Sequence, residues 1–208
     1  HNADQHEAIL QQFMDHEADL MIGTQMIAKG LDLPLVTLVG VISADPGLAL
    51  PDFRSGERAF RLLTQVAGRA GRGLLGGSVI LQTYQPEHYA IAAAAGHDYA
   101  QFYEQEIAYR RDLGYPPFRR LVRLLIRNRH PVKAQQEAER AAVMIAKKLA
   151  AMDMSGTTIM GPAPCFFRKL DDVYRWQVLV RGPDPAAVFQ GLELRPGWML
   201  DIDPVDVL

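Results

Sequence analysis

This sequence of 208 residues has one cysteine and no long apolar run, and both shortages exclude whole classes of protein. Cys165 has no partner for an internal disulfide and cannot form a cysteine-based zinc cluster alone. The longest apolar stretches, such as residues 35–44, are interrupted by Thr or Ser and are far shorter than the ~20 residues of a membrane span. No basic segment followed by an apolar one opens the chain, as a secretory signal would. We therefore expect a cytoplasmic protein with no membrane partner.

Motifs for holding phosphate or metal are also missing. No Gly-x-x-x-x-Gly-Lys-Ser/Thr loop occurs, because no glycine between residues 68 and 77 is followed by the required Lys and Ser/Thr. No Asp-Glu-x-His sequence occurs, and the six histidines show no spacing typical of metal ligands. The aspartates near the C-terminal end are interpreted as a solvated strand end rather than a cation site. We expect no metal site in this sequence.

The composition is that of a globular protein with an uneven charge distribution. With 49% hydrophobic and 22% charged residues, the chain can bury the core of one or two domains. The net charge is only −2, but residues 110–129 hold seven arginines and one aspartate. Such a segment is the kind of surface that binds a polyanion, but charge alone favours a solvated basic face.

The order of expected elements predicts an α/β first part. A helix over 5–17 precedes short apolar strands, and a helix over 55–70 follows them. Their alternation favours a parallel sheet covered on both faces. The expected strands are 19–23, 35–42 and 78–84.

The later part predicts a helical connector and a small α+β domain. Residues 86–114 are helical, with Asp98 as N-cap and a Glu106–Arg110 pair. The following order, β-α-β-β-α-β, is typical of a ferredoxin-like fold. Its expected elements are 121–127, 132–152, 157–160, 165–170, 174–181, 185–190 and 198–202. The predicted divisions are 1–86, a connector over 87–115, and 116–208.

The helix that starts at Ser55 has two unlike faces. At 100° per residue, an apolar arc faces the core, and it consists of Ala59, Leu63, Val66, Ala67 and Ala70. The opposite stripe consists of Arg58, Arg61, Gln65, Arg69 and Arg72. Guanidinium groups bind phosphate in a bidentate manner, so the stripe predicts phosphate contacts, with a solvated basic face as the alternative.

Two segments resemble motifs of superfamily 2 helicases. Gln65-Val-Ala-Gly-Arg-Ala-Gly-Arg72 resembles motif VI, and residues 23–34 (Gly-Thr-Gln-Met-Ile-Ala-Lys-Gly-Leu-Asp-Leu-Pro) resemble motif V. Further segments narrow the resemblance to the PriA family of primosomal replication-restart helicases, and it spans nearly the whole chain. These segments are 51–58 (PDFRSGER), 81–84 (LQTY), 114–118 (GYPPF), 161–164 (GPAP), 174–177 (YRWQ) and 201–204 (DIDP).

The resemblance implies a role for each matching residue. Arg69 and Arg72 would act as arginine fingers on the transferring γ-phosphoryl group, and Gln65 would lie near it or near the attacking water. Thr24 and Gln25 would contact the DNA backbone. Gly30 and Gly68 would line the nucleotide site, and Asp32 would contact the nucleotide or couple the nucleotide site to the DNA site. The cofactor implied is ATP with Mg²⁺, and Zn²⁺ is expected only in an upstream part that this sequence lacks.

The resemblance also implies a fold, an activity and partners. It implies a second RecA-like lobe followed by an S10-like C-terminal domain. The intact bacterial protein would be an ATP-dependent 3′–5′ DNA helicase that restarts stalled replication forks and initiates primosome assembly. Its partners would be forked and single-stranded DNA, the single-stranded-DNA-binding protein, other primosome proteins and the loader of the replicative helicase. This chain, which starts without Met, is expected to be part of that protein and inactive alone.

In the C-terminal domain, basic residues interleave with aromatic ones, as in single-strand binders. The predicted DNA contacts are Arg119, Arg120, Arg168, Lys169 and Arg175. Strand alternation instead predicts that Tyr174 and Trp176 belong to the core. Another superfamily 2 translocase and a non-enzymatic binding module of the primosome remain alternative functions.

Overall fold

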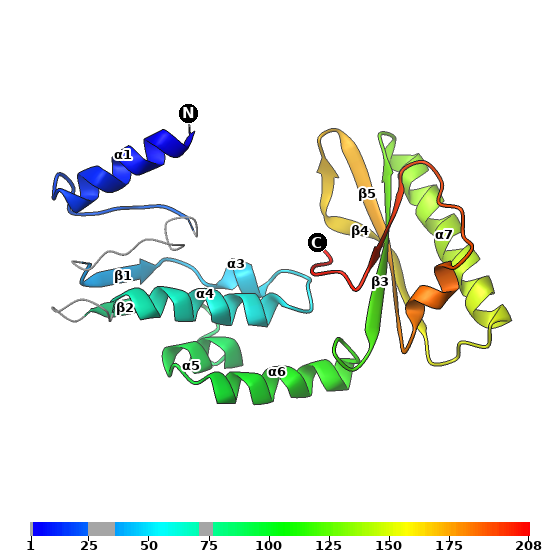
Figure 1. Cartoon of the computed structure of the whole chain (residues 1–208), viewed down its shortest axis with the longest axis horizontal. Helices are drawn as coiled ribbons and strands as arrows, with labels where there is room; N and C mark the ends of the chain where they lie inside the picture. Colours follow the sequence, from blue (N-terminus) through cyan, green and yellow to red (C-terminus); the bar gives the residue numbers. More distant parts are fainter. Residues whose placement is uncertain (1, 25–35, 71–76) are drawn as a thin grey trace. The chain divides into compact units, whose positions relative to one another are not determined.

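A computed structural model describes residues 2–24, 36–70 and 77–208 of the chain (Figure 1). The chain divides into two units, of which the first comprises residues 1–46 and 58–102 and the second residues 47–57 and 103–208. Helices α4 (Ser55–Ala70) and α6 (Tyr99–Leu113) contribute residues to both units. None of the described helices is long and apolar enough to cross a membrane.

The first unit is built on a small parallel sheet. Strand β1 (Leu38–Val41) pairs with β2 (Ser78–Leu81), and Leu38 lies opposite Ser78. The parallel pairing confirms the predicted α/β layer. The shorter helices nearby in sequence are α1 (Asn2–Met14), α3 (Asp45–Leu48) and α5 (Tyr89–Ala95).

Two expectations for the first unit are wrong within the described residues. The predicted strand over 19–23 is absent, and Leu20 and Ile22 are 73% and 77% exposed. An apolar segment becomes a strand only where a neighbouring strand accepts its hydrogen bonds, and the described parallel sheet has two strands. The sheet is also not covered on both faces, because Leu38 is 58% and Ile80 62% exposed.

Helix α4 has the bounds and the apolar face that its sequence predicts. Ala59, Leu63 and Val66 are each at most 7% exposed, as their helical spacing requires. Phe60, on the same side, stacks on Phe102 with ring centroids 4.1 Å apart. Arg61 and Gln65, two described members of the predicted stripe, are exposed and lie away from this buried face.

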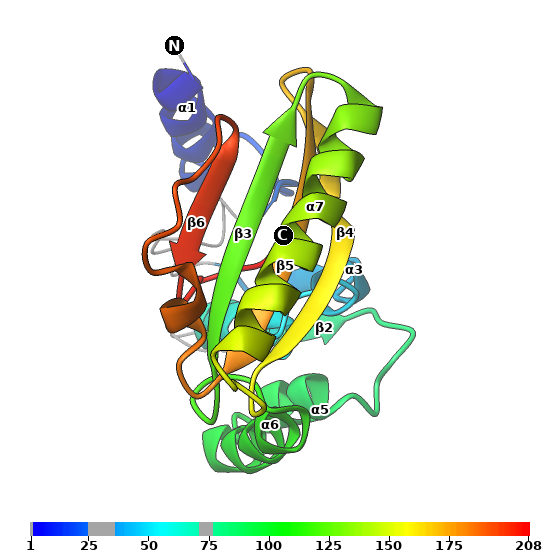
Figure 2. The same ribbon diagram turned by 90° about the vertical axis from the view of Figure 1, so that its right-hand side faces the viewer.

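The second unit is an antiparallel sheet with the long helix α7 (Pro131–Ala151) on one face (Figure 2). The strand order is β4-β5-β3-β6, and the elements follow the predicted β-α-β-β-α-β sequence with a 3₁₀ helix in the second helical position. The predicted strands over 157–160 and 165–170 are one bulged strand. The elements are β3 (Arg120–Asn128), β4 (Thr158–Leu170), β5 (Val173–Gly182), η1 (Pro185–Phe189) and β6 (Trp198–Ile202).

Alternate side chains of β3 lie on opposite faces of the sheet, and one set of them forms part of the core beneath α7. Val122, Leu124 and Ile126 are at most 1% exposed and pack with residues of α7 such as Ala141 and Ile145. Leu121 and Arg123 therefore belong to the other face of the sheet. Both are also buried, so this strand is covered on both faces.

Candidate functional site

Helix α4 carries the described part of the motif VI segment. Gln65 is exposed on the stripe, as is Arg61 one turn earlier. A methyl group at Gly68 would meet nothing within 4 Å among the described residues, so packing there does not require a glycine. Because glycine costs a helix about 1 kcal/mol relative to alanine, a glycine without a packing reason is compatible with close approach of a ligand.

The rest of the predicted nucleotide site lies mostly outside the described residues. Arg69 belongs to the last turn of α4, but its side chain is not among those described. Gln25, Gly30, Asp32 and Arg72 are also outside them. Thr24 is described and is exposed. The described residues thus supply one polar side chain of the predicted catalytic set, Gln65.

A polar cluster lies at the carboxyl edge of the parallel sheet, where ligands bind in many α/β folds. The Asp45 carboxylate accepts hydrogen bonds from the Thr83 hydroxyl at 2.8 Å and the Tyr84 N–H at 3.1 Å. The Thr83 hydrogen bond is the main reason why the pKa of Asp45 lies below its usual value. This cluster joins the chain after β1 to the chain after β2, and its own hydrogen bonds satisfy it.

The segment before α4 belongs to the second unit, which the sequence did not suggest. Asp52 is 7% exposed, and its carboxylate accepts hydrogen bonds from the N–H groups of Arg54 at 2.7 Å and Val207 at 2.9 Å. Phe53 stacks on Tyr115 with ring centroids 5.5 Å apart. Residues 51–57, part of a segment that resembles the helicase family, therefore pack with residues 103–208 as part of the second unit, which we also call the C-terminal unit.

An ion-pair chain continues from this segment into α6. Glu57, in the first turn of α4, lies 2.8 Å from both Arg54 and Arg110. Arg110 also pairs with the buried Glu106 at 2.6 Å, the predicted i,i+4 pair, and lies over the Phe53 ring. The hydrogen bonds from Arg54 and then Arg110 outweigh burial and lower the pKa of Glu57 to about 2. No single-sequence signal links residue 57 to residue 110.

The predicted DNA-contacting cations of the C-terminal unit are largely engaged within it. Arg119 donates to the carbonyl of Gly156 at 3.3 Å, and Arg120 pairs with Asp203 at 2.6 Å. Lys169 pairs with Asp172 at 2.7 Å, and Arg175 donates to the Leu208 oxygen at 3.2 Å. Arg168 is exposed. These ion pairs reduce the net positive charge that the segment offers to a polyanion.

The same cations form two groups rather than one. Arg120 lies opposite Gly182 at one end of β5, whereas Lys169 lies opposite Tyr174 at the other. Eight residues of strand separate those ends, which is roughly 27 Å. A ligand that contacts both groups must be extended, as a nucleic acid backbone is.

The aromatic residues of the hairpin divide between surface and core. Phe166 and Phe167 are 51% and 52% exposed and meet edge to face with centroids 5.1 Å apart. Trp176 packs against the core under α7, as strand alternation predicts. Tyr174 is half-buried, and Lys169 lies over its ring. The exposed phenylalanines alone remain available for stacking.

Arg123 belongs to the basic segment 110–129, but its side chain is buried and makes its contacts inside the second unit. It is 5% exposed, and its Nη2 donates to the Leu208 oxygen at 2.6 Å. Arg127, on the same face of β3, is exposed and contacts the Met199 sulfur. The position of Arg123 removes one arginine of the basic segment from any surface site.

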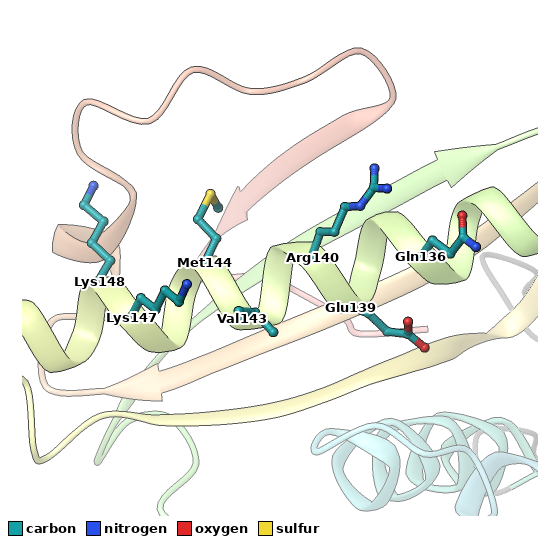
Figure 3. A pocket seen from close by; sticks show the side chains of 7 residues that line it. All are labelled: Gln136, Glu139, Arg140, Val143, Met144, Lys147 and Lys148. Carbon is teal, nitrogen blue, oxygen red and sulfur yellow. The ribbon is translucent and has the colours of Figure 1, made fainter.

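A shallow hollow runs along the outer face of α7 (Figure 3). All seven residues that line it come from this one helix, including Arg140, Val143 and Lys147. Lys148, at its end, donates to the Gln190 carbonyl at 2.6 Å. A surface formed by one helix does not enclose a ligand, and we assign no site to it.

Metal ligands are not gathered in the part of the chain that is described. No group of three or more His, Cys, Asp or Glu side chains there could hold a metal ion. Cys165 is a free cysteine and is buried.

Comparison with known proteins matches the two halves of the chain separately. The family model "Helicase conserved C-terminal domain" matches residues 1–73, and "Primosomal protein N C-terminal domain" matches residues 111–205. Replication restart protein PriA of Bacillus subtilis is 47% identical over 176 residues, which are 85% of this chain and 21% of that protein. The proteins of the same name from Synechocystis and Treponema pallidum are 41% and 42% identical over 97% and 96% of this chain, and 25% and 31% of their own lengths. The chain thus spans about a quarter of the length of these relatives.

Proposed function

We propose, since the chain belongs to the PriA family of replication restart proteins, that it forms the second motor lobe and C-terminal domain of a fork-restarting DNA helicase. The intact bacterial protein would move 3′ to 5′ along DNA with ATP and Mg²⁺ in the cytoplasm and initiate primosome assembly. One observation carries the proposal: the helicase family model matches residues 1–73 and the primosomal family model matches residues 111–205 of the same chain. The motif VI segment, which starts in the last turns of helix α4, lies within the helicase match.

The motor chemistry is assigned to two segments of the first unit, residues 24–32 and residues 65–72. Gln65 would orient the attacking water, while Arg69 and Arg72 would stabilise the charge that develops on the γ-phosphoryl group. Gly30, Asp32 and Gly68 would approach the nucleotide, and Thr24 and Gln25 the DNA backbone. Bound Mg²⁺ would neutralise phosphate charge. The sequence holds neither a Gly-x-x-x-x-Gly-Lys-Ser/Thr loop nor an Asp-Glu-x-His motif, so we expect that this chain alone does not hydrolyse ATP.

We also propose a fold family for each of the two units, on the basis of its β-sheet. We assign the parallel β1–β2 pair to a RecA-like lobe, because helix α4, which carries the start of motif VI, connects these two parallel strands in the sequence. We assign the sheet order β4-β5-β3-β6, with α7 on one face, to a ferredoxin-like, S10-like domain. The boundaries 1–86, 87–115 and 116–208 stay a prediction, and so does a role for the single-stranded-DNA-binding protein and the helicase loader as partners.

The arginine-finger assignment is tested in a full-length protein that contains this chain. Arg69→Ala and Arg72→Ala should each reduce DNA-stimulated ATP hydrolysis by roughly 10³-fold or more while fork binding persists. Arg140→Ala, which removes an exposed arginine of α7 outside the stripe and the motif, is the control and should keep wild-type turnover. Wild-type turnover in both motif variants would overturn the assignment.

A binding module without ATPase activity is the second candidate, and the basic residues of the second unit support it. This chain should bind single-stranded or forked DNA weakly, with log K falling against log[salt] at a slope of roughly −2 to −4 for about three or four phosphate contacts. The double substitution Arg119→Glu and Arg120→Glu should weaken binding equally on unrelated sequences. Arg140→Glu, a charge reversal on α7, is the control. Absence of DNA binding at low salt would assign the basic segment to a protein partner instead.

A further inference from the structure

The first turn of α4 is held by the C-terminal unit, whereas the motif VI residues lie at the other end of the same helix. Glu57 belongs to the second unit by its contacts with Arg54 and Arg110. Gln65 follows two turns later, and Arg69 one turn after that. A continuous helix transmits a displacement of its first turn to its last, because its hydrogen-bonded backbone is stiff over 16 residues.

A continuous path of hydrogen bonds connects the β-sheet of the second unit to that first turn. Arg175 of β5 and the buried Arg123 of β3 both donate to the Leu208 oxygen. The neighbouring Val207 N–H donates to Asp52, and Asp52 accepts the N–H of Arg54, which pairs with Glu57. Every member of this path lies within the second unit.

The path starts at a predicted DNA-contacting residue and ends at the motor helix. Arg175 is one of the cations assigned above to DNA. Arg110 holds the far end in place, since it bonds both Glu57 and the buried Glu106 and also donates to the Pro116 carbonyl just before β3. The sheet that carries Arg175 and the first turn of α4 are therefore joined by one set of bonds within the second unit.

We propose that the Glu57–Arg110 ion pair is a positioning link, through which DNA bound to the C-terminal unit sets the orientation of helix α4 and hence the rate of ATP hydrolysis. The proposal rests on the motor function proposed above. Glu57 and Arg110 are positioning residues, because they act through Gln65 and Arg69 and contact neither nucleotide nor DNA.

The test is a double-mutant cycle in a full-length protein that contains this chain. Glu57→Gln and Arg110→Gln should each lower the maximal DNA-stimulated kcat for ATP hydrolysis by roughly 5- to 20-fold, in line with the cost of small misplacements at an active site. The DNA concentration that gives half-maximal stimulation and the rate without DNA should stay at wild-type values. The double variant should be no slower than the slower single variant, because both remove one link.

Glu137→Gln is a matched control. Glu137 also pairs with two arginines, Arg140 at 2.8 Å and Arg195 at 3.2 Å, but it lies on α7 and is outside the path. It should keep the wild-type kcat. Glu57→Gln is isosteric at a side chain that is 30% exposed, so it carries the test even where Arg110→Gln unfolds the protein.

The outcomes separate this proposal from the function on which it rests. Wild-type stimulation in Glu57→Gln, or a change confined to the half-maximal DNA concentration, would overturn the positioning link and leave the motor function standing. Absence of DNA-stimulated hydrolysis in the wild-type protein would overturn both.

Discussion

Single residues acquire their properties here from partners far away in the sequence, and Glu57 is the clearest example. Its carboxylate lies between Arg54 and Arg110, and it also occupies the first turn of α4, where a helix favours negative charge. These contacts hold its pKa at about 2 instead of 4.5. The ionised form is therefore part of the fold at neutral pH.

This pKa predicts how stability changes with pH. Because the pKa of Glu57 is lower in the folded state than in the unfolded state, its ionised carboxylate stabilises the fold at pH values above the unfolded pKa of 4.5. This contribution to the unfolding free energy is lost as the pH falls toward the folded pKa of about 2. Wild-type protein should exceed Glu57→Gln in unfolding free energy by about 1 kcal/mol at pH 6, once screening at this partly exposed site is allowed for, and by almost nothing near pH 2. Urea unfolding of both proteins across this range measures the difference. A difference that does not vary with pH would contradict the assignment.

Elements are joined by turns whose backbone geometry restricts the residue type. The β4–β5 hairpin turns through Asp171 and Asp172, at φ +48° and +61°, which aspartate tolerates better than most residues. Gly197, at φ +85°, precedes β6, and its carbonyl accepts the N–H of Arg127. A side chain there would collide with the Arg127 carbonyl. The start of β6 therefore requires glycine.

Two glycines with similar φ angles make a matched pair of variants. Gly197→Ala should lower the unfolding free energy by about 2–4 kcal/mol, through left-handed backbone strain plus the collision with Arg127. Gly191→Ala, at φ +69° in open space, should cost only the strain, about 1 kcal/mol. Chemical denaturation of the two variants gives both values, and equal losses would show that the collision is relieved without cost.

At the scale of the whole molecule, a segment that precedes α4 completes the C-terminal unit. Asp52 and Val207 are 155 positions apart in the sequence, yet the Asp52 carboxylate accepts a buried hydrogen bond from the Val207 N–H. Phe53 and Val207 also share a small apolar cluster with Leu121. The second unit is thus discontinuous in sequence, so a fragment starting after residue 102 lacks part of its own packing.

This discontinuity can be tested by substitution. Asp52→Ala should destabilise the chain by about 1–3 kcal/mol, because it leaves buried N–H groups without their charged acceptor. Asp15→Ala, at an exposed carboxylate that accepts hydrogen bonds from the Gln11 side chain, should change stability by less than about 0.5 kcal/mol. Thermal unfolding followed at Trp176 and Trp198 reports on the second unit. Equal effects of the two variants would mean that residues 51–57 are not integral to it.

Limited proteolysis tests the predicted domain boundary. A C-terminal fragment of about 90 residues is expected to accumulate after cleavage near the connector, because the β3–β6 sheet with α7 has its own core. It should be less stable than the same sheet in the whole chain, because it lacks the contacts of residues 47–57. If no such fragment accumulates, the C-terminal sheet depends on residues 47–57 for its stability.

Features that depend on near neighbours could be predicted from the sequence alone. The bounds of α4 and its buried face follow from helical periodicity, and the Glu106–Arg110 pair follows from i,i+4 spacing. Asp98 caps α6 by accepting the N–H of Gln101, and β6 has its predicted bounds. Motif VI could be recognised because its residues are consecutive in the sequence. The Asp98 cap and the Glu106–Arg110 pair depend on contacts within about four residues, where local geometry decides the outcome, whereas β6 is also paired with the distant strand β3.

Only the tertiary structure decided the partners across long separations. Nothing near Arg123 in the sequence indicates that it is buried against Leu208, nor that Arg120 pairs with Asp203. The apolar segment 19–23 matched a strand but lacks a neighbouring strand among the described residues. The docking of residues 51–57 on the C-terminal unit was likewise invisible, because a buried hydrogen bond between Asp52 and Val207 is selected by packing of the whole chain and leaves no periodic signal.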